Sequence, residues 1–240
     1  VSAIVVTRSK LLGSWTQYLP PIFAGDRRQG DRFGAVLALD GDQLVVSAPY
    51  SSSITTTTWD FECGCLEGWS VQGTAFSYQP TYGDNSYVRA VYRGDPSISL
   101  LGAGKSSRLR GRYYVGTFEQ RPGNTTDYKN ANSSYPAGST QGDSPTGSMS
   151  SQVFMINGQS ISFLIGGGCD ATTEYVELLV DGFGVYKATG KCTERMESVT
   201  FDVSLYQGRA GQIRVVDAGV STWGHINVDD FQFDWEVAGS

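Results

Sequence analysis

The chain has 240 residues, 40% of them apolar, which is enough to bury one good hydrophobic core or slightly more. Its formal net charge of −6 argues against nucleic-acid binding, because phosphates require a basic face. No apolar run approaches the roughly eighteen residues of a membrane-spanning helix. Thirty glycines and few helix-favouring runs predict an all-β protein with many tight turns.

Residues 1–50 form a first unit, in which we expect four short strands. They lie within SAIVVTRSK, SWTQYLPP and GDRFGAVLALDGDQLVVSAPY, and Asp40-Gly41-Asp42 joins the last two. The stretch GDRFGAVLALDGDQLVVSAP resembles an FG-GAP repeat, the blade unit of integrin-α-type β-propellers. SAIVVTRSKLLGSWTQ resembles the outer strand and link that precede this motif. The calcium loop DxDxDG of many such blades is absent from these fifty residues.

A propeller needs about four to eight blades, and this unit resembles one. Its strands have apolar residues on both faces, so another surface must cover them. Val1 begins inside an expected strand, which indicates that this sequence is part of a longer chain. Further blades of that longer chain would then provide the covering surface. Other copies of the chain would also provide it. Head-to-tail contacts would then build a filament or surface layer, with Val1, Ile4 and Val6 in a strand added to a neighbour's sheet.

Residues 51–58, SSSITTTT, read as a polar linker with a candidate O-glycan cluster, and residues 59–240 as a second unit. The second unit opens with Trp59 and Phe61, whose spacing puts both rings on the inner face of a strand. Further strands are expected at residues 73–78, 86–91 and 109–116. A long Gly-, Ser-, Asn- and Thr-rich stretch follows between Phe118 and Ser151.

The C-terminal half, residues 161–233, predicts the second half of an antiparallel β-sandwich. Apolar residues alternate with Glu177 and Leu179 before Asp181-Gly182, which is a hairpin signal. The same period of two recurs around Arg214. No segment in this half has the period of a helix.

As a whole, the second unit resembles the jelly-roll accessory domain of some fructan-cleaving glycoside hydrolases and many large secreted proteins. The residues behind this resemblance are FE…GW, YYVGTFE, GDSPTGSMSSQVFMINGQSISFLIGGG, VELLVDG, FDVSLYQGRAGQIRVVD and WGHINVDDFQF. The resemblance implies an antiparallel jelly-roll β-sandwich without known catalysis.

Four cysteines, at positions 63, 65, 169 and 192, are spaced poorly for zinc. Disulfides fit better and imply an oxidising compartment. The expected hairpin returns the chain to its start and brings Cys169 near Cys192. Cys63 and Cys65 are then left to each other or to another partner.

Two N-glycosylation sequons, at Asn124 and Asn132, lie in one polar loop. With the disulfides, they predict an extracellular or cell-surface glycoprotein. The tripeptide Arg93-Gly94-Asp95 matches the integrin-recognised sequence, and we interpret it as a chance match.

Carboxylates are the candidate metal ligands. Asp60 and Glu62 lie on the expected first strand of the sandwich, and Asp229 and Asp230 on the last. First and last strands commonly pair in jelly rolls, so these four acids are expected to converge on one edge as a structural Ca²⁺ site. The alternative is that the acids are solvated or cap turns.

No catalytic group is expected. The single histidine, His225, has no second histidine or nucleophile signature beside it, so we expect a packed, hydrogen-bonded strand residue. Exposed aromatic side chains would instead stack on sugars, and the candidates are Trp69, Tyr78, Tyr82, Tyr87 and Trp223.

The sequence thus supports two functions. The first is a non-catalytic structural subunit that assembles with other copies of itself through the N-terminal unit. The alternative is a carbohydrate-binding module of a secreted protein, which contacts glycans through loops or a concave sheet face.

Overall fold

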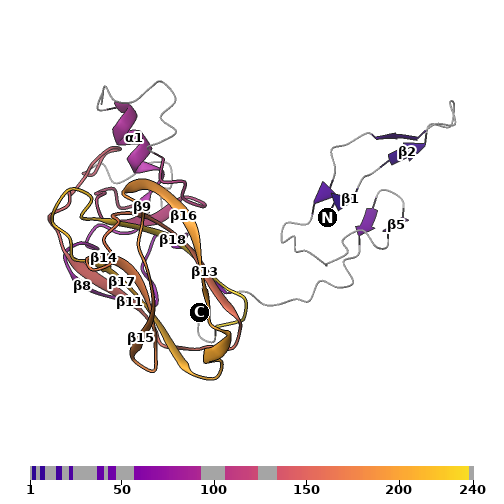
Figure 1. Cartoon of the computed structure of the whole chain (residues 1–240). Helices are drawn as coiled ribbons and strands as arrows, with labels where there is room; N and C mark the ends of the chain where they lie inside the picture. The colour runs from indigo at the N-terminus through magenta and orange to yellow at the C-terminus, as the bar shows by residue number, and fades with distance from the viewer. Residues whose placement is uncertain are drawn as a thin grey trace. The chain divides into compact units, whose positions relative to one another are not determined.

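The structure is a computed structural model that describes residues 57–92, 106–123 and 134–237, together with six short strands among the first fifty residues. The chain divides into two compact units, Val1–Ile54 and Thr55–Ser240 (Figure 1). Within the described ranges, no helix is long and apolar enough to cross a membrane.

The first unit contains three antiparallel strand pairs. β1 (Ser2–Ala3) pairs with β4 (Ile22–Phe23), and β2 (Val6–Arg8) pairs with β3 (Trp15–Gln17). β5 (Leu37–Asp40) pairs with β6 (Gln43–Val46), which confirms the expected hairpin, with Gly41 and Asp42 between the two strands.

The second unit is an antiparallel sandwich of two sheets (Figure 1). The first sheet has the order β16-β13-β18-β10-β9, with β7 also paired to β18. Its strands are β7 (Thr58–Trp59), β9 (Thr81–Tyr82), β10 (Tyr113–Gly116), β13 (Ser160–Gly167), β16 (Thr193–Asp202) and β18 (Ile226–Phe233).

The second sheet has the order β15-β14-β17-β11-β8, with β12 also paired to β17. Its strands are β8 (Trp69–Gly73), β11 (Gly147–Ser151), β12 (Phe154–Met155), β14 (Glu174–Val180), β15 (Phe183–Ala188) and β17 (Ala210–Asp217). β14 and β15 form the hairpin expected from the Asp181-Gly182 turn.

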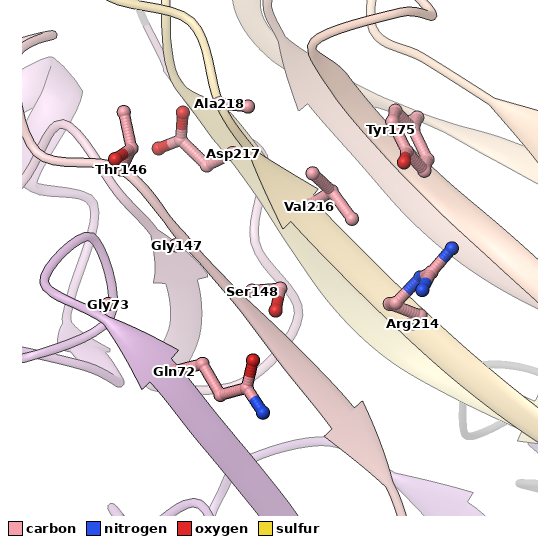
Figure 2. Close-up of a pocket in the computed structure, with 10 residues that line it drawn as sticks. All are labelled: Gln72, Gly73, Thr146, Gly147, Ser148, Tyr175, Arg214, Val216, Asp217 and Ala218. Atoms are coloured by element: carbon pink, nitrogen blue, oxygen red, sulfur yellow. The ribbon is translucent and has the colours of Figure 1, made fainter.

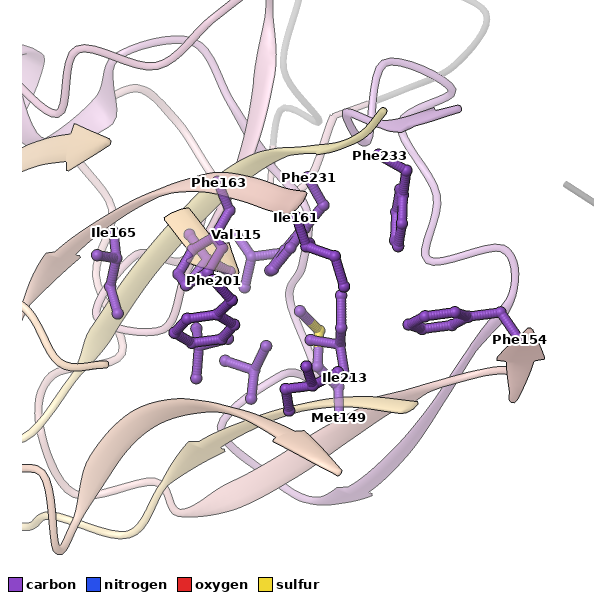
Figure 3. Packing of buried hydrophobic residues seen from close by; sticks show 14 of the residues in the cluster. Val115, Met149, Phe154, Ile161, Phe163, Ile165, Phe201, Ile213, Phe231 and Phe233 are labelled. Atoms are coloured by element: carbon purple, nitrogen blue, oxygen red, sulfur yellow. The ribbon is translucent and has the colours of Figure 1, made fainter. Parts of the chain in front are cut away.

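The core lies between the sheets and is rich in aromatic rings (Figure 3). β17 alternates along its length, with Ile213 and Val215 buried and Arg214 and Val216 on the outer face. Trp59 packs edge-on against Phe154 and Phe233, and Phe61 is buried beside Trp69. The inward direction expected of Trp59 and Phe61 is confirmed, but Phe61 lies beyond the end of β7 and has φ +59°, so the two rings do not share a strand.

β13 does not alternate because both faces of the first sheet are covered at this strand. Phe163 and Ile165 pack into the main core, whereas Leu164 packs on the opposite face against Tyr114 and Met196. The apolar run in the sequence at this strand reflects burial on both sides.

One expected strand is wrong. Residues 86–91 belong to a helix, α1 (Asn85–Tyr92), which lies at one end of the sandwich (Figure 1). Asp84 caps it, because its Oδ1 accepts a hydrogen bond from the backbone N–H of Tyr87 at 3.2 Å. The expected strand at residues 73–78 is also largely wrong, since β8 ends at Gly73 and turns follow. A short 3₁₀ helix, η1 (Ser204–Tyr206), precedes β17.

Candidate functional site

Two rows of side chains lie on the outer face of the second sheet. Strand register aligns one row across β8, β11, β17 and β14: Gln72, Ser148, Val216 and Tyr175. The next row runs on to β15 and comprises Ser70, Ser150, Arg214, Glu177 and Lys187. The residues between these rows point inward, as fully buried Met149 and Val215 show.

A shallow hollow of about 410 Å³ lies on this face (Figure 2). Gln72, Ser148, Tyr175 and Arg214 line it, and Thr146 and Asp217 lie at one end. β8 and β11 approach closely there, since a Cβ on Gly73 would collide with the carbonyl oxygen of Thr146. Gly73 has φ +77°, which also favours glycine.

Tyr175, the aromatic residue of the hollow, is held in place by Lys187, which belongs to a small group of charged side chains. The Lys187 ammonium lies over the Tyr175 ring, 3.7 Å from its centroid. Lys187 Nζ is also 3.9 Å from a carboxylate oxygen of Glu177, and Glu177 pairs with Arg214. The hollow therefore combines a positioned aromatic ring with hydrogen-bonding groups.

A second cluster of polar side chains lies at the end of the sandwich next to α1. Arg89 of α1 forms ion pairs with Glu119 and Glu194, both nearly or fully buried. His225, only 4% exposed, shares a hydrogen bond of 2.6 Å between its Nδ1 and Asp143 Oδ1. Its Nε2 lies 3.6 Å from Glu194 Oε2, a distance that makes this contact an ion pair rather than a hydrogen bond.

These contacts shift the pKa values of the buried groups. Burial lowers the pKa of His225, but the hydrogen bond to Asp143 and the ion pair with Glu194 outweigh burial and raise it to about 9. Burial raises the pKa of Glu119 to about 7 against the lowering effect of Arg89. For Glu194, the cations His225 and Arg89 outweigh burial and bring the pKa to about 2. His225 is thus the packed, hydrogen-bonded residue expected, one position before β18.

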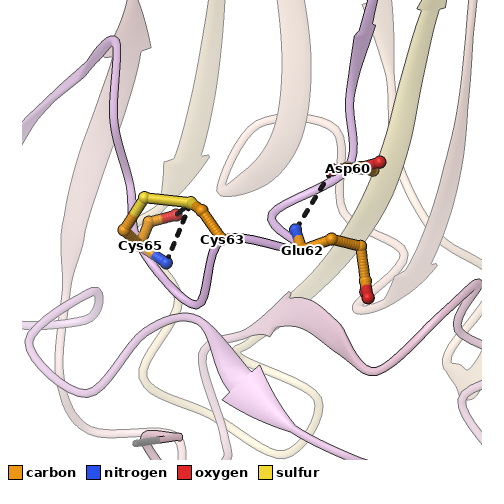
Figure 4. The surroundings of a disulfide bond; sticks show 4 residues. All are labelled: Asp60, Glu62, Cys63 and Cys65. Atoms are coloured by element: carbon orange, nitrogen blue, oxygen red, sulfur yellow. Dashed lines mark hydrogen bonds between the residues drawn. A yellow bond between two sulfur atoms is a disulfide. The ribbon is translucent and has the colours of Figure 1, made fainter. Parts of the chain in front are cut away.

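Three of the four predicted calcium ligands, Glu62, Asp229 and Asp230, contact the segment 110–113. β7 pairs with β18, as expected for the first and last strands. Asp60 and Glu62 were expected on this first strand, which is wrong, because β7 ends at Trp59 and both residues follow it. Glu62 accepts hydrogen bonds from the backbone N–H groups of Arg112 and Tyr113 at 2.6 and 2.9 Å. Asp229 accepts one from the N–H of Arg110 at 2.7 Å, and the Arg110 guanidinium pairs with Asp230. Asp60 accepts one from the N–H of Glu62 at 3.1 Å (Figure 4).

N–H donors and arginine thus occupy most of these carboxylate oxygens. Among the buried oxygens of this set, Oδ1 of Asp229 has no hydrogen-bond partner. In the part of the chain that the structure describes, no three His, Cys, Asp or Glu side chains come together as a metal site. Calcium binding stays a prediction.

Both cysteine pairs are bonded in the structure. Cys169 joins Cys192 with a Cα–Cα distance of 5.0 Å, as the hairpin predicts. Cys63 joins Cys65 with a Cα–Cα distance of 5.2 Å in the turn after β7 (Figure 4).

The predicted sugar-stacking aromatics do not form one platform. Trp69 packs against core rings, Tyr78 lies beside Tyr135, and Tyr82 lies beside Tyr113. Tyr87 is 39% exposed on α1, and Trp223 lies against His225. The aromatic residue of the hollow is Tyr175, which we did not predict. Its outward position in the alternating run EYVELLV was the available signal.

Several predicted residues lie outside the described residues. These are the sequon residues Asn124 and Asn132, the tripeptide Arg93-Gly94-Asp95, and Val1 and Ile4 of the predicted assembly strand. Val6 begins β2, for which only the backbone is described. Glycosylation and assembly stay predictions.

Comparison with known proteins identifies one segment by family. Residues 20–57 match the model of the FG-GAP repeat. This agrees with the resemblance noted from GDRFGAVLALDGDQLVVSAP, and extends it past residue 50. The chain is also 27% identical over 223 residues to "Putative glycosyl hydrolase ecdE" of Aspergillus rugulosus. The match covers 92% of this chain and 25% of the relative, so the chain spans about a quarter of that relative's length.

Solved structures similar to the chain have low sequence identity to it. TmCBM61 in complex with β-1,4-galactotriose is 14% identical with a TM-score of 0.37, covering 72% of this chain and 93% of that one. The K1 cleaved adhesin domain of Lys-gingipain from Porphyromonas gingivalis W83 is 11% identical with a TM-score of 0.36, covering 75% and 98%. CBM51 from Clostridium perfringens GH95 in complex with methyl-galactose is 11% identical with a TM-score of 0.29, covering 73% and 99%.

Proposed function

We propose that the second unit is a non-catalytic carbohydrate-binding module, and that the outer face of its second sheet holds the saccharide. The observation that supports this most directly is the hollow, in which the Tyr175 ring lies in one row with Gln72 and Ser148. Ligand sites commonly combine an apolar surface with a few hydrogen-bonding groups that fix orientation.

The chemistry of a sugar matches these groups. The C–H edges of a pyranose ring are apolar and slightly positive, so they stack on the negative face of a tyrosine ring. Lys187 covers one face of Tyr175, and the sugar stacks on the other face. Gln72 and Ser148 offer both donors and acceptors to hydroxyl groups.

The relationship to the Aspergillus rugulosus protein supports the same class of function. Nearly the whole chain is similar to a quarter of a protein whose name is that of a glycosyl hydrolase. We propose that this part attaches a carbohydrate-active protein to its polysaccharide. Its paired cysteines also support a role in an oxidising compartment, at or outside the cell surface.

The test is calorimetric titration of the full chain with neutral gluco-, manno-, galacto- and fructo-oligosaccharides. We expect one class of oligosaccharide to bind, and Tyr175→Ala to weaken that binding about tenfold, since losing an aromatic stack costs roughly 1–1.5 kcal/mol. Gln72→Ala should weaken it about fivefold through a lost hydrogen bond worth roughly 1 kcal/mol.

Tyr87→Ala is the matched control, because Tyr87 is an exposed tyrosine of α1 outside the hollow. It should leave affinity unchanged. Equal loss in the Tyr87 and Tyr175 variants, or no binding by any oligosaccharide of the panel, would contradict the proposed site.

A further inference from the structure

The two disulfides have different surroundings. Cys169 comes two residues after the Gly167 end of β13 and Cys192 one residue before β16, and Gly167 and Thr193 are partners in the ladder. Strand pairing thus keeps both sulfur atoms adjacent even when the bond is open. No strand contains Cys63 or Cys65, which lie in the turn between β7 and β8.

The short turn is fixed at its ends and open at its middle. Phe61 is buried in the core, and Leu66 packs against it. Glu62, just before Cys63, accepts backbone hydrogen bonds from Arg112 and Tyr113. Cys63 itself is exposed to solvent. Opening this disulfide therefore leaves the turn's attachments to the sandwich in place.

The hydrogen bonds of the turn favour one direction of cleavage. The backbone N–H of Cys65 donates to Sγ of Cys63 at 3.2 Å (Figure 4), and the carbonyl oxygen of Cys65 lies 3.3 Å from the same sulfur without a hydrogen between them. A donor at this position stabilises negative charge on that sulfur, which makes Cys63 the better leaving group in thiol–disulfide exchange.

We propose that Cys63–Cys65 is a thiol–disulfide exchange site that forms a reversible mixed disulfide with a small thiol of the glutathione class. The thiolate of the small molecule attacks Sγ of Cys65, and the Cys63–Cys65 bond breaks with its electron pair on Sγ of Cys63. The products are a mixed disulfide on Cys65 and a thiolate on Cys63. Cys63 can then attack the mixed disulfide and expel the small thiolate, which restores the starting state.

A second molecule of the small thiol completes the reduction. It attacks the mixed disulfide, leaves as the oxidised small-molecule disulfide, and releases the Cys65 thiolate. Two small thiols are thereby oxidised and one protein disulfide is reduced. Because both ends of the turn stay packed, the sandwich remains folded in every state.

The experiment exposes the full chain to graded reduced glutathione, followed by acid quenching and alkylation of free thiols with N-ethylmaleimide. Cleavage after glutamate releases residues 63–67 as one peptide, because Glu62 and Glu67 flank it. Fragment mass spectrometry then identifies the sulfur that has each adduct. We expect half-opening of Cys63–Cys65 at a glutathione concentration at least tenfold below that for Cys169–Cys192, with glutathione on Cys65 and maleimide on Cys63.

Single-cysteine variants test the direction of exchange. The wild type, first reduced at Cys63–Cys65, and the Cys63→Ser variant are treated with oxidised glutathione, whose disulfide the free Cys65 thiolate attacks. Cys63→Ser should keep its adduct on Cys65, because the resolving thiol is gone, whereas the wild-type adduct should be short-lived. Far-UV circular dichroism checks that each variant is folded. Simultaneous opening of both disulfides, earlier opening of Cys169–Cys192, or glutathione mainly on Cys63 in the wild type would overturn the proposal.

Discussion

At the scale of single residues, the buried polar end of the sandwich illustrates the cost of buried charge. Isolated ions are expensive to bury, so each must find a partner. Arg89 meets Glu119 and Glu194, and His225 meets Asp143 and Glu194. These contacts join α1 and the segment around Asp143 to the strands, so they hold irregular parts of the chain against the sheets.

His225 makes the stability of the fold depend on pH. Its folded pKa of about 9 lies above the unfolded value of 6.5, so its contribution is complete below pH 6.5 and is lost as the pH rises through 9. The contribution is on the order of 3 kcal/mol. We expect the unfolding free energy of the wild type, measured by urea titration, to fall between pH 6 and pH 9.5.

His225→Gln is the comparison, because glutamine preserves polarity but does not titrate. Its stability should change clearly less than that of the wild type over the same interval. Parallel pH profiles for the two proteins would show that His225 is not the group responsible.

At the scale of elements, burial on one or both faces explains which strands were easy to recognise. β17 is buried on one face and alternates, whereas β13 is buried on both faces and reads as a continuous apolar run. α1 was mistaken for a strand because, among its described side chains, the buried ones are polar Asn85 and Ser86. A pattern of apolar residues cannot indicate a helix that buries polar side chains.

The disulfides should differ in their effect on stability. Cys169–Cys192 closes the larger loop, with a sequence separation of 23, and Cys63–Cys65 the smaller, with a separation of 2. By loop-closure entropy, replacing Cys169 and Cys192 by alanine should cost about 3 kcal/mol, and replacing Cys63 and Cys65 only about 1.5 kcal/mol.

Denaturant unfolding of the two double variants measures this difference, and each serves as the other's control. Peptide mapping without reduction should first show the same pairing in the wild type. Equal destabilisation by the two changes would contradict the argument from loop length.

At the scale of the whole molecule, the sequence of the first unit predicts apolar surface that another surface must cover. Its described strands form three separate two-stranded sheets, and such sheets are marginally stable alone. The family match covers a single FG-GAP repeat, whereas a propeller needs about four to eight blades. Self-association of the chain through this unit therefore stays a prediction alongside saccharide binding by the sandwich.

Deleting residues 1–10 should separate self-association of the chain from saccharide binding by the sandwich. The deletion removes β1 and β2, the partners of β4 and β3, and should leave a folded sandwich that no longer assembles. Light scattering and electron microscopy of both chains measure assembly, and a Val6→Asp variant should assemble more weakly than the full chain. If the full chain is monomeric and its first fifty residues resist proteolysis, assembly through this unit is wrong.

The all-β class, the FG-GAP segment, the Asp181-Gly182 hairpin and the pairing of Cys169 with Cys192 could all be predicted from the sequence. Each depends on neighbours in the sequence or on a hairpin that returns the chain to its start. The partners of the acids and of the aromatic rings became clear only from the folded structure. Strand register puts Tyr175 in one row with Gln72, and packing puts backbone N–H donors against Glu62 and Asp229. Glu62 and its partner Arg112 are 50 positions apart, and Asp229 and its partner Arg110 are 119 positions apart. No local sequence pattern specifies which distant backbone segment will supply such a partner.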